Sequence, residues 1–204
     1  MCVYSLSVGM PPKFIFVRHG EAEHNVAFRE NHDMSVFLKE QFTDAPLTQV
    51  GIQQAKETGK KLSSLNILDI WSSPLTRCIH TADEIFEETS AQKLYLHDNL
   101  LERLGGGHVC NSRKSKTELK KTHTLWNTKY LAETPVTWIE RENEYALRQR
   151  MFMLITLLTD IYKDSPDDSH IVIVGHADAI YSLIGKLLTN AQYIILSVQE
   201  IQAL

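Results

Sequence analysis

The sequence is poor in cysteine, and its three cysteines, Cys2, Cys78 and Cys110, are widely spaced. An odd and scattered set provides neither a disulfide framework nor a CxxC metal motif. Such a set is typical of a chain that works in a reducing compartment. We therefore expect a cytoplasmic protein whose fold depends on a packed core.

Long apolar runs and a large excess of one charge are also lacking. No stretch reaches the roughly 20 apolar residues of a transmembrane helix, and residues 1–12 lack the basic-then-apolar order of a signal peptide. The net charge of −4 offers no basic field for nucleic acid or an anionic membrane, so we expect neither partner. A local basic stretch from Arg113 to Lys121 is either a solvated surface or a region that attracts an anionic substrate.

Apolar residues, in contrast, are plentiful enough for one core. They make up 43% of the 204 residues, and this length fits one domain with an insertion. We expect a leader over residues 1–12 and a single domain over residues 13–204. Regular periodicity weakens after residue 104, so residues 104–140 are predicted to be an insertion over the active face.

The order of strands and helices predicts the fold class. Short apolar, β-branched and aromatic runs predict strands over 13–17, 67–71, 93–96, 170–174 and 193–198. Helical periodicity lies between them, and residues 21–45 are expected to be irregular or partly helical. Alternating strands and helices favour an α/β protein, a three-layer α/β/α sandwich with a largely parallel central sheet.

Four segments have the apolar spacing of amphipathic helices. They cover 48–65 with Thr48 as the N-cap, 75–86 with Ser73 as the N-cap, 147–161, and 180–187. The residues expected to face the core from the first and last of these helices are Leu47, Val50, Ala55, Leu62, Leu65, Ile180, Ile184 and Leu187.

Three polar motifs directly follow predicted strands. Arg18-His19-Gly20-Glu21 follows the first strand, Ser72-Ser73 leads to Arg77 after the second, and Gly175-His176 ends the fourth. Ligands of such sheets bind beyond the carboxyl ends of the strands. We therefore expect these motifs to meet in one crevice.

The residue types in that crevice suit phosphoryl transfer. A phosphomonoester carries about two negative charges, and the planar guanidinium groups of Arg18 and Arg77 can neutralise them with paired hydrogen bonds. Neutral imidazole has a lone pair, so His19 is the predicted nucleophile and would form a phosphohistidine. His176 is predicted to donate to the phosphoryl oxygens. The leaving alkoxide needs a proton, for which Glu102 is the candidate, with Glu21 as its rival.

Together these motifs resemble the histidine phosphatase superfamily, which has the phosphoglycerate mutase-like fold. The resemblance extends from about Lys13 to Val198. Its blocks are Arg18-His19-Gly20-Glu21, Leu47-Thr48 with Gly51 and Gln54-Ala55, Ser73-Pro74-Leu75 with Arg77 and Thr81-Ala82, and Gly175-His176.

The resemblance implies His19 as phospho-acceptor, with Arg18, Arg77 and His176 around the phosphate and Glu102 at the position of the proton donor. Asn25 stands where the family has a phosphate-contacting asparagine. The stretch from Leu101 to Arg113 is similar to a branch of plant and fungal phosphatase-like members, in which an acid stands at the position of Asn111. We also expect Glu21, His108 and Arg113 to contact the substrate.

Three functions remain open after this comparison. A phosphomonoester hydrolase (EC 3.1.3) with a small phosphorylated substrate and no cofactor is favoured over a phosphomutase (EC 5.4.2), because the Trp-Glu-Gly segment of glycolytic mutases is absent after Glu102. A non-catalytic module that binds a phosphorylated ligand is the third. The oligomeric state stays open, with a dimer among the options.

Two other sites are poorly supported by spacing. A metal site built from His19, Glu21, Glu23 and His24 lacks the His-Glu-x-x-His spacing, so no metal is expected. A cysteine phosphatase centred on Cys110 would have only two residues before its arginine, which is too few for a loop around phosphate.

Overall fold

The computed structural model describes residues 11–135 and 140–204, so most of the expected leader lies outside it. Within those residues six strands form one sheet in the order β4-β3-β2-β5-β1-β6. The strands are β1 (Lys13–Arg18), β2 (Asn66–Ser72), β3 (Lys93–His97), β4 (Trp126–Tyr130), β5 (Ser169–Gly175) and β6 (Tyr193–Leu196). β6 runs antiparallel to β1, and the other pairings are parallel.

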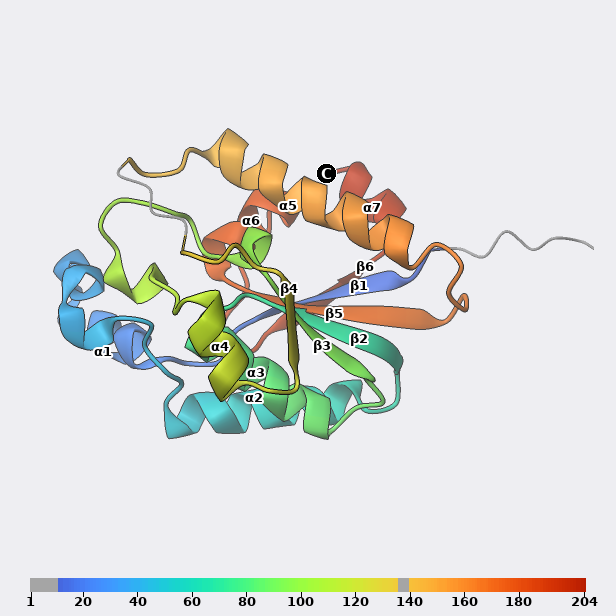
Figure 1. The fold of residues 1–204 in the computed structure, drawn as a ribbon, viewed down its shortest axis with the longest axis horizontal. Coiled ribbons are helices and arrows are strands. Elements are labelled where there is room, and N and C mark those ends of the chain that lie inside the picture. The colour runs from blue at the N-terminus through green and yellow to red at the C-terminus, as the bar shows by residue number, and fades with distance from the viewer. Residues whose placement is uncertain (1–10, 136–139) are drawn as a thin grey trace, which may run out of the picture.

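Helices cover both faces of this sheet, as predicted. They are α1 (Glu23–Asn31), α2 (Gln49–Leu62), α3 (Thr76–Glu87), α4 (Lys116–Thr122), α5 (Glu144–Ile161), α6 (Ala177–Ile184) and α7 (Val198–Gln202). Figure 1 shows α5, α6 and α7 on one face, α2 and α3 on the other, and α1 beyond one end of the strands. In the described part of the chain, no helix combines the length and the apolar character needed to cross a bilayer.

Strand β1 shows why the layers form. Phe14 and Phe16 pack with α5, α6 and α7, whereas Ile15 and Val17 pack with α2 and α3. All four side chains are fully buried. A parallel strand covered on both faces is apolar at every position, and this continuous run is what identified the strand in the sequence.

The expected helix faces are partly wrong. Val50 of α2 is 56% exposed, and Leu187 is 64% exposed because α6 ends at Ile184. The buried stripe of α2 consists of small residues and one leucine: Gly51, Ala55, Thr58, Gly59 and Leu62. A stripe of small residues lets α2 approach α3 closely, and hydrophobic periodicity alone does not detect such a face.

The N-cap predicted for the second helix is also wrong. α3 begins at Thr76 with Leu75 as its N-cap, and Leu75 makes no side-chain cap. The carboxylate of Asp44 performs this task from a distant loop, because it accepts hydrogen bonds from the Thr76 backbone N–H at 2.7 Å and the Thr76 hydroxyl at 2.6 Å. The Ser73 hydroxyl instead lies 2.8 Å from Nε2 of His176.

The segment expected to be an insertion contains part of the sheet. Residues 126–130 form β4, which pairs in parallel with β3 at the sheet edge, and α4 precedes it. The indole of Trp126 anchors this strand by donating to Asp83 at 2.9 Å. β4 alternates buried and exposed positions, so it lacks the continuous apolar run of the inner strands.

Two glycines bring the loop after β1 against the start of α2. A Cβ on Gly51 would lie 2.0 Å from the carbonyl oxygen of Glu21, and a Cβ on Gly20 would lie 2.4 Å from that of Gly51. Both clashes are with backbone, which cannot move without displacing the Arg18-His19 segment. This contact therefore requires glycine on both sides.

We expect Gly51→Ala to lower the free energy of unfolding by about 2 kcal/mol. Alanine gains about 1 kcal/mol in helix propensity, but overpacking against backbone costs about 3 kcal/mol or more. Urea denaturation checks this. Gly175→Ala is the control, since its Cβ would lie 3.7 Å from Ile180, an ordinary contact. Equal free energies of unfolding of the two variants would contradict this and show that the loop after β1 can shift at little cost.

Candidate active site

The carboxyl ends of three inner strands meet at one place. Arg18 pairs with Gly175 where β1 and β5 end. The His19 backbone N–H donates to the Gly175 carbonyl at 3.0 Å, and the Ser73 N–H donates to the Val174 carbonyl at 3.0 Å. The sheet's hydrogen-bond ladder therefore continues into all three predicted motifs and fixes their relative positions.

A cavity of about 370 Å³ opens above these strand ends. Its lining combines charged residues, histidines and apolar side chains: Arg18, His19, His24, Asn25, Phe28, Met34, Phe37, Arg77, Glu102, Arg103, His108, Cys110, Asn111, Arg141, Ala177, Asp178 and Leu187. The expected residues Arg18, His19, Arg77, Glu102, Asn25 and His108 are all among them. The cavity is therefore the place where the sequence motifs converge.

The protonation of His19 follows from its partners. Nδ1 lies 2.7 Å from the Gly20 carbonyl oxygen, which can only accept, so Nδ1 carries the proton. Nε2 then has the lone pair and accepts from Nε of Arg77 at 3.3 Å. Burial, followed by the charges of Arg77 and Arg18, lowers the pKa of His19 well below its ordinary value. The imidazole is neutral at neutral pH and has the lone pair that a nucleophile needs.

Arg77 is the central charged group, and it is almost completely buried. Besides the contact with His19, Nη1 donates to the Cys110 carbonyl at 2.7 Å, and Nη2 donates to Oδ1 of Asn111 at 2.9 Å. These neutral acceptors hold the guanidinium without cancelling its charge. It therefore remains available to neutralise an anion in the cavity.

Two nitrogens of the cavity residues are buried without a hydrogen-bond partner among the described residues. They are Nε of Arg18 and Nδ1 of His24. Nη1 of Arg18 donates to the Leu188 carbonyl at 2.8 Å, which holds the side chain in place. Unpaired buried polar atoms are costly, so each of these two nitrogens has the capacity for a further hydrogen bond.

His176 is completely buried behind Arg77. Its Nδ1 lies 3.2 Å from Nη2 of Arg77, which can only donate, so Nδ1 accepts and Nε2 carries the proton toward the Ser73 hydroxyl. Both nitrogens thus have protein partners in this arrangement. A direct donation from His176 to a phosphoryl oxygen stays a prediction, and it requires one of these contacts to be exchanged.

Glu102 lies at the N-terminus of α6. Its carboxyl oxygens accept from the backbone N–H groups of Arg103 at 2.8 Å, Ala179 at 3.1 Å and Asp178 at 3.3 Å. These hydrogen bonds favour the ionised form, but burial and the nearby Asp178 carboxylate outweigh them and raise the pKa of Glu102. A carboxyl group with a raised pKa in the cavity can act as a general acid.

Two other predicted substrate contacts lie away from this cavity. The Glu21 carboxylate accepts from Arg29 at 2.5 Å and from the Thr48 hydroxyl at 3.0 Å, and the Arg29 contact lowers its pKa. Arg113 forms two hydrogen bonds with Asp98, at 2.8 and 3.2 Å. Both side chains hold loops in place, so they are not available to a ligand of this cavity, and Glu21 is a poor rival to Glu102 as the acid.

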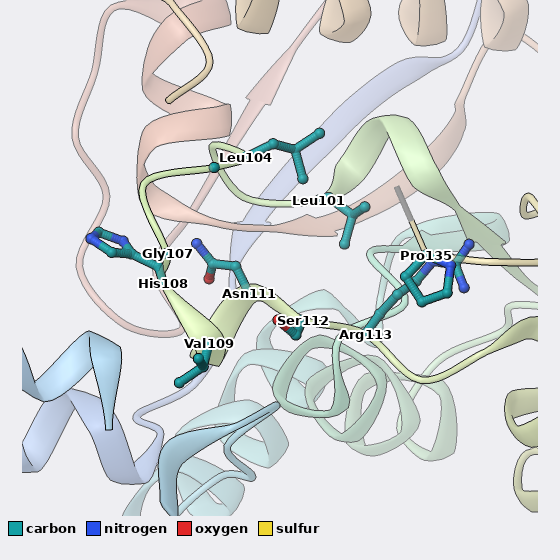
Figure 2. A pocket seen from close by; sticks show the side chains of 10 residues that line it. Leu101, Leu104, Gly107, His108, Val109, Asn111, Ser112, Arg113 and Pro135 are labelled. Carbon is teal, nitrogen blue, oxygen red and sulfur yellow. The ribbon is translucent and has the colours of Figure 1, made fainter. Parts of the chain in front are cut away.

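A second cavity of about 370 Å³ adjoins the first along residues 101–113 and shares His108 and Asn111 with it. Figure 2 shows Asn111 and His108 on one side of this segment, while Arg113 extends to the other side beside Pro135. Arg113 lines this second cavity only. The orientation explains why only one of the two predicted substrate contacts of this segment, His108 and not Arg113, lines the cavity at His19.

The alternatives to a histidine nucleophile gain no support. Burial raises the pKa of the Cys110 thiol, which disfavours the thiolate. The Glu21 carboxylate is paired with Arg29. Among residues 11–135 and 140–204, no group of three His, Cys, Asp or Glu side chains is arranged to hold a metal ion.

Several cavity residues were not singled out by the sequence motifs. Asn111 links Arg77 to the Arg103 carbonyl, to which its Nδ2 donates at 3.3 Å. Phe28 and Phe37 come from the stretch expected to be irregular. The sequence could have drawn attention to Asn111, because the similar plant and fungal members have an acid at this position. Nothing in the spacing pointed to the two phenylalanines.

This fold places a buried histidine beside two arginines at the strand ends of an α/β sandwich. A family model of the histidine phosphatase superfamily (branch 1) matches residues 14–197. The chain therefore belongs to the histidine phosphatase superfamily.

Similar proteins include both phosphatases and mutases by name. A "probable phosphatase" of Schizosaccharomyces pombe is 29% identical over 87% of this chain, and the chain spans only 57% of that protein's length. The "probable phosphoglycerate mutase GpmB" of Proteus mirabilis is 30% identical, covering 87% of this chain and 75% of the relative. Among solved structures, the ecdysone phosphate phosphatase from "Bombix mori" has a TM-score of 0.63 at 15% identity, with 90% and 88% coverage, which bears on the fold alone.

Proposed function

We propose that this protein is a phosphomonoester hydrolase that acts on a small phosphorylated substrate through a phosphohistidine on His19. The observation that carries the proposal is the arrangement at His19. A neutral imidazole presents its Nε2 lone pair beside Arg77, in a cavity that also contains Arg18 and the carboxyl group of Glu102.

The proposed reaction has two steps. In the first, the Nε2 lone pair of His19 attacks phosphorus, the bond to the ester oxygen breaks, and the leaving alkoxide takes a proton from Glu102. In the second, the Glu102 carboxylate removes a proton from water as the water oxygen attacks phosphorus. The N–P bond then breaks, and its electron pair returns to His19. Arg18 and Arg77 balance the charge of the non-bridging oxygens in both steps.

A phosphomutase is the second candidate, favoured by the 30% identity to a protein named as a phosphoglycerate mutase. A mutase must return its phosphoryl group to a second hydroxyl and protect it from water. A non-catalytic binding module is the third candidate, and it would form no covalent intermediate.

A phosphoenzyme experiment separates the three candidates. The protein is mixed with a phosphomonoester, quenched within milliseconds and digested, and acid-labile phosphate on the His19 peptide is measured by mass spectrometry at neutral pH. A hydrolase gives a transient phosphopeptide and stoichiometric inorganic phosphate. Labelled phosphate that returns to an added acceptor alcohol indicates a mutase, and the absence of any phosphopeptide and of any phosphate release indicates a binding module.

A further inference from the structure

One wall of the cavity is aromatic. Phe37, on the 3-10 helix Met34–Leu38, lies with its ring centroid 5.3 Å from that of Phe28 and 5.4 Å from that of His108, and both pairs are tilted by 33°. The His24 ring meets the edge of Phe37 at 5.9 Å. Phe28, Phe37 and His108, here called the aromatic wall, come from three separate segments and all line the cavity.

Exposed apolar side chains also line the cavity. Met34 is 55% exposed and Leu187 is 64% exposed, and both line the same cavity. Leaving such side chains in water forgoes the stabilisation that burial provides. Apolar side chains beside a few polar groups are typical of the lining of a ligand pocket.

The same wall carries no positive charge. Burial, and then the charges of Arg77 and Arg18, lower the pKa of His24 to about 3, so its ring is neutral at neutral pH. Burial and the charge of Arg141 likewise lower the pKa of His108. The cation that acts on this wall is therefore Arg141, which also lines the cavity.

Arg141 and a second lining arginine, Arg103, are both already paired with carboxylates. Nε of Arg103 lies 3.1 Å from Asp178, and its Nη2 contacts Glu144. Arg141 lies 3.6 Å from the same Asp178 oxygen. Their charges are compensated within the protein, which leaves the aromatic wall as the feature that distinguishes this part of the cavity.

The geometry points to an uncharged apolar group, preferably an aromatic ring, as the part of the substrate that occupies this wall while its phosphoryl group lies at His19 and Arg77. This inference deepens the proposed function and rests on it for the phosphoryl end. The His19 ring lies 6.2 Å from His24, and His24 lies 5.9 Å from Phe37, so the wall is two ring contacts from the nucleophile. A ring on a short linker to phosphate spans such a distance.

Binding of phosphonates, which cannot be hydrolysed, tests this inference independently of turnover. Calorimetry compares 3-phenylpropylphosphonate, propylphosphonate and 3-carboxypropylphosphonate, which share the charged head and the linker. We expect the phenyl compound to have a Kd about 10- to 100-fold lower than the propyl compound. Phe37→Ala should reduce this ratio to within about threefold of unity.

Two further variants keep the test decisive. Phe28→Ala removes a half-buried ring from α1 and should also reduce the ratio of the two Kd values. If one of the two variants fails to fold, the other still tests the inference. Tyr145→Ala removes a ring that is 74% exposed and outside the cavity, and it should leave the ratio intact. Equal affinities of the three phosphonates for the unmodified protein, or tightest binding of the carboxylate, would overturn the inference.

The outcome also separates this inference from the proposed function. Ring-dependent binding without phosphate release from 3-phenylpropyl phosphate would contradict the hydrolase while leaving the aromatic wall as a binding surface. Hydrolysis that requires His19 but ignores the ring would support the hydrolase and contradict the role of Phe37.

Discussion

His19→Ala is expected to lower kcat/KM for p-nitrophenyl phosphate by about 10⁴-fold or more. Alanine removes the Nε2 lone pair that would attack phosphorus, and Cys110 and His176 are poorly suited to replace it. The thiol of Cys110 has a pKa raised by burial, and His176 is completely buried and is not among the lining residues of the cavity. Initial rates in the presence of a chelator, with and without the substitution, measure the effect.

His123→Ala is the matched control, because His123 ends α4 and is not among the lining residues of the cavity. The kcat/KM of His123→Ala for p-nitrophenyl phosphate should stay within about twofold of that of the unmodified protein. Undiminished turnover by His19→Ala, or a strict requirement for added metal, would rule out the phosphohistidine route.

Glu102→Gln is expected to have the second largest effect, and that effect should depend on the leaving group. An alkoxide is a poor leaving group without a proton, so loss of a general acid should slow alkyl phosphate hydrolysis by about 10²- to 10³-fold. p-Nitrophenolate leaves without protonation, so its release should slow by less than about tenfold. A plot of log kcat/KM against leaving-group pKa should therefore become steeper in the variant.

The pH dependence has a definite sign. The pKa of Glu102 is raised, and only its protonated form donates, so the rate on alkyl phosphates should fall as pH rises through that pKa. Glu102→Gln should lose this descending limb. Glu87→Gln, at an exposed position of α3, should retain both the limb and the slope. Equal losses on alkyl and aryl substrates would assign the proton donor to another group.

The sequence predicted the part of the site that strands position. Arg18 ends β1 and His176 directly follows β5; the continuous apolar runs of both strands are easy to identify, and parallel pairing brings their ends together. Arg77 follows for a similar reason, since its helix starts four residues after β2 ends. A local apolar pattern identifies each strand, and pairing of the strands in the sheet then places residues that are far apart in the sequence side by side.

Loop residues could not be placed in this way. Arg113 and Glu21 are residue types that occur in phosphoryl-transfer sites, but each is held by a partner on another segment, Asp98 and Arg29 respectively. The path of a loop decides which oppositely charged partner a long side chain contacts, and local periodicity does not predict that path. The same holds for Phe28 and Phe37, whose stretch lacked a clear period.

The Asp44 carboxylate has a consequence for how the two ends of the site depend on each other. It lies six residues after Leu38, at the end of the segment that carries Phe37, and it holds the first residue of the helix that carries Arg77. The Asp44 carboxylate thus connects the segment of Phe37, whose ring would select a substrate, to the helix of Arg77, whose guanidinium would activate it. Because both segments depend on the same contact, a substitution of Asp44, which takes no part in the reaction, would change both KM and kcat.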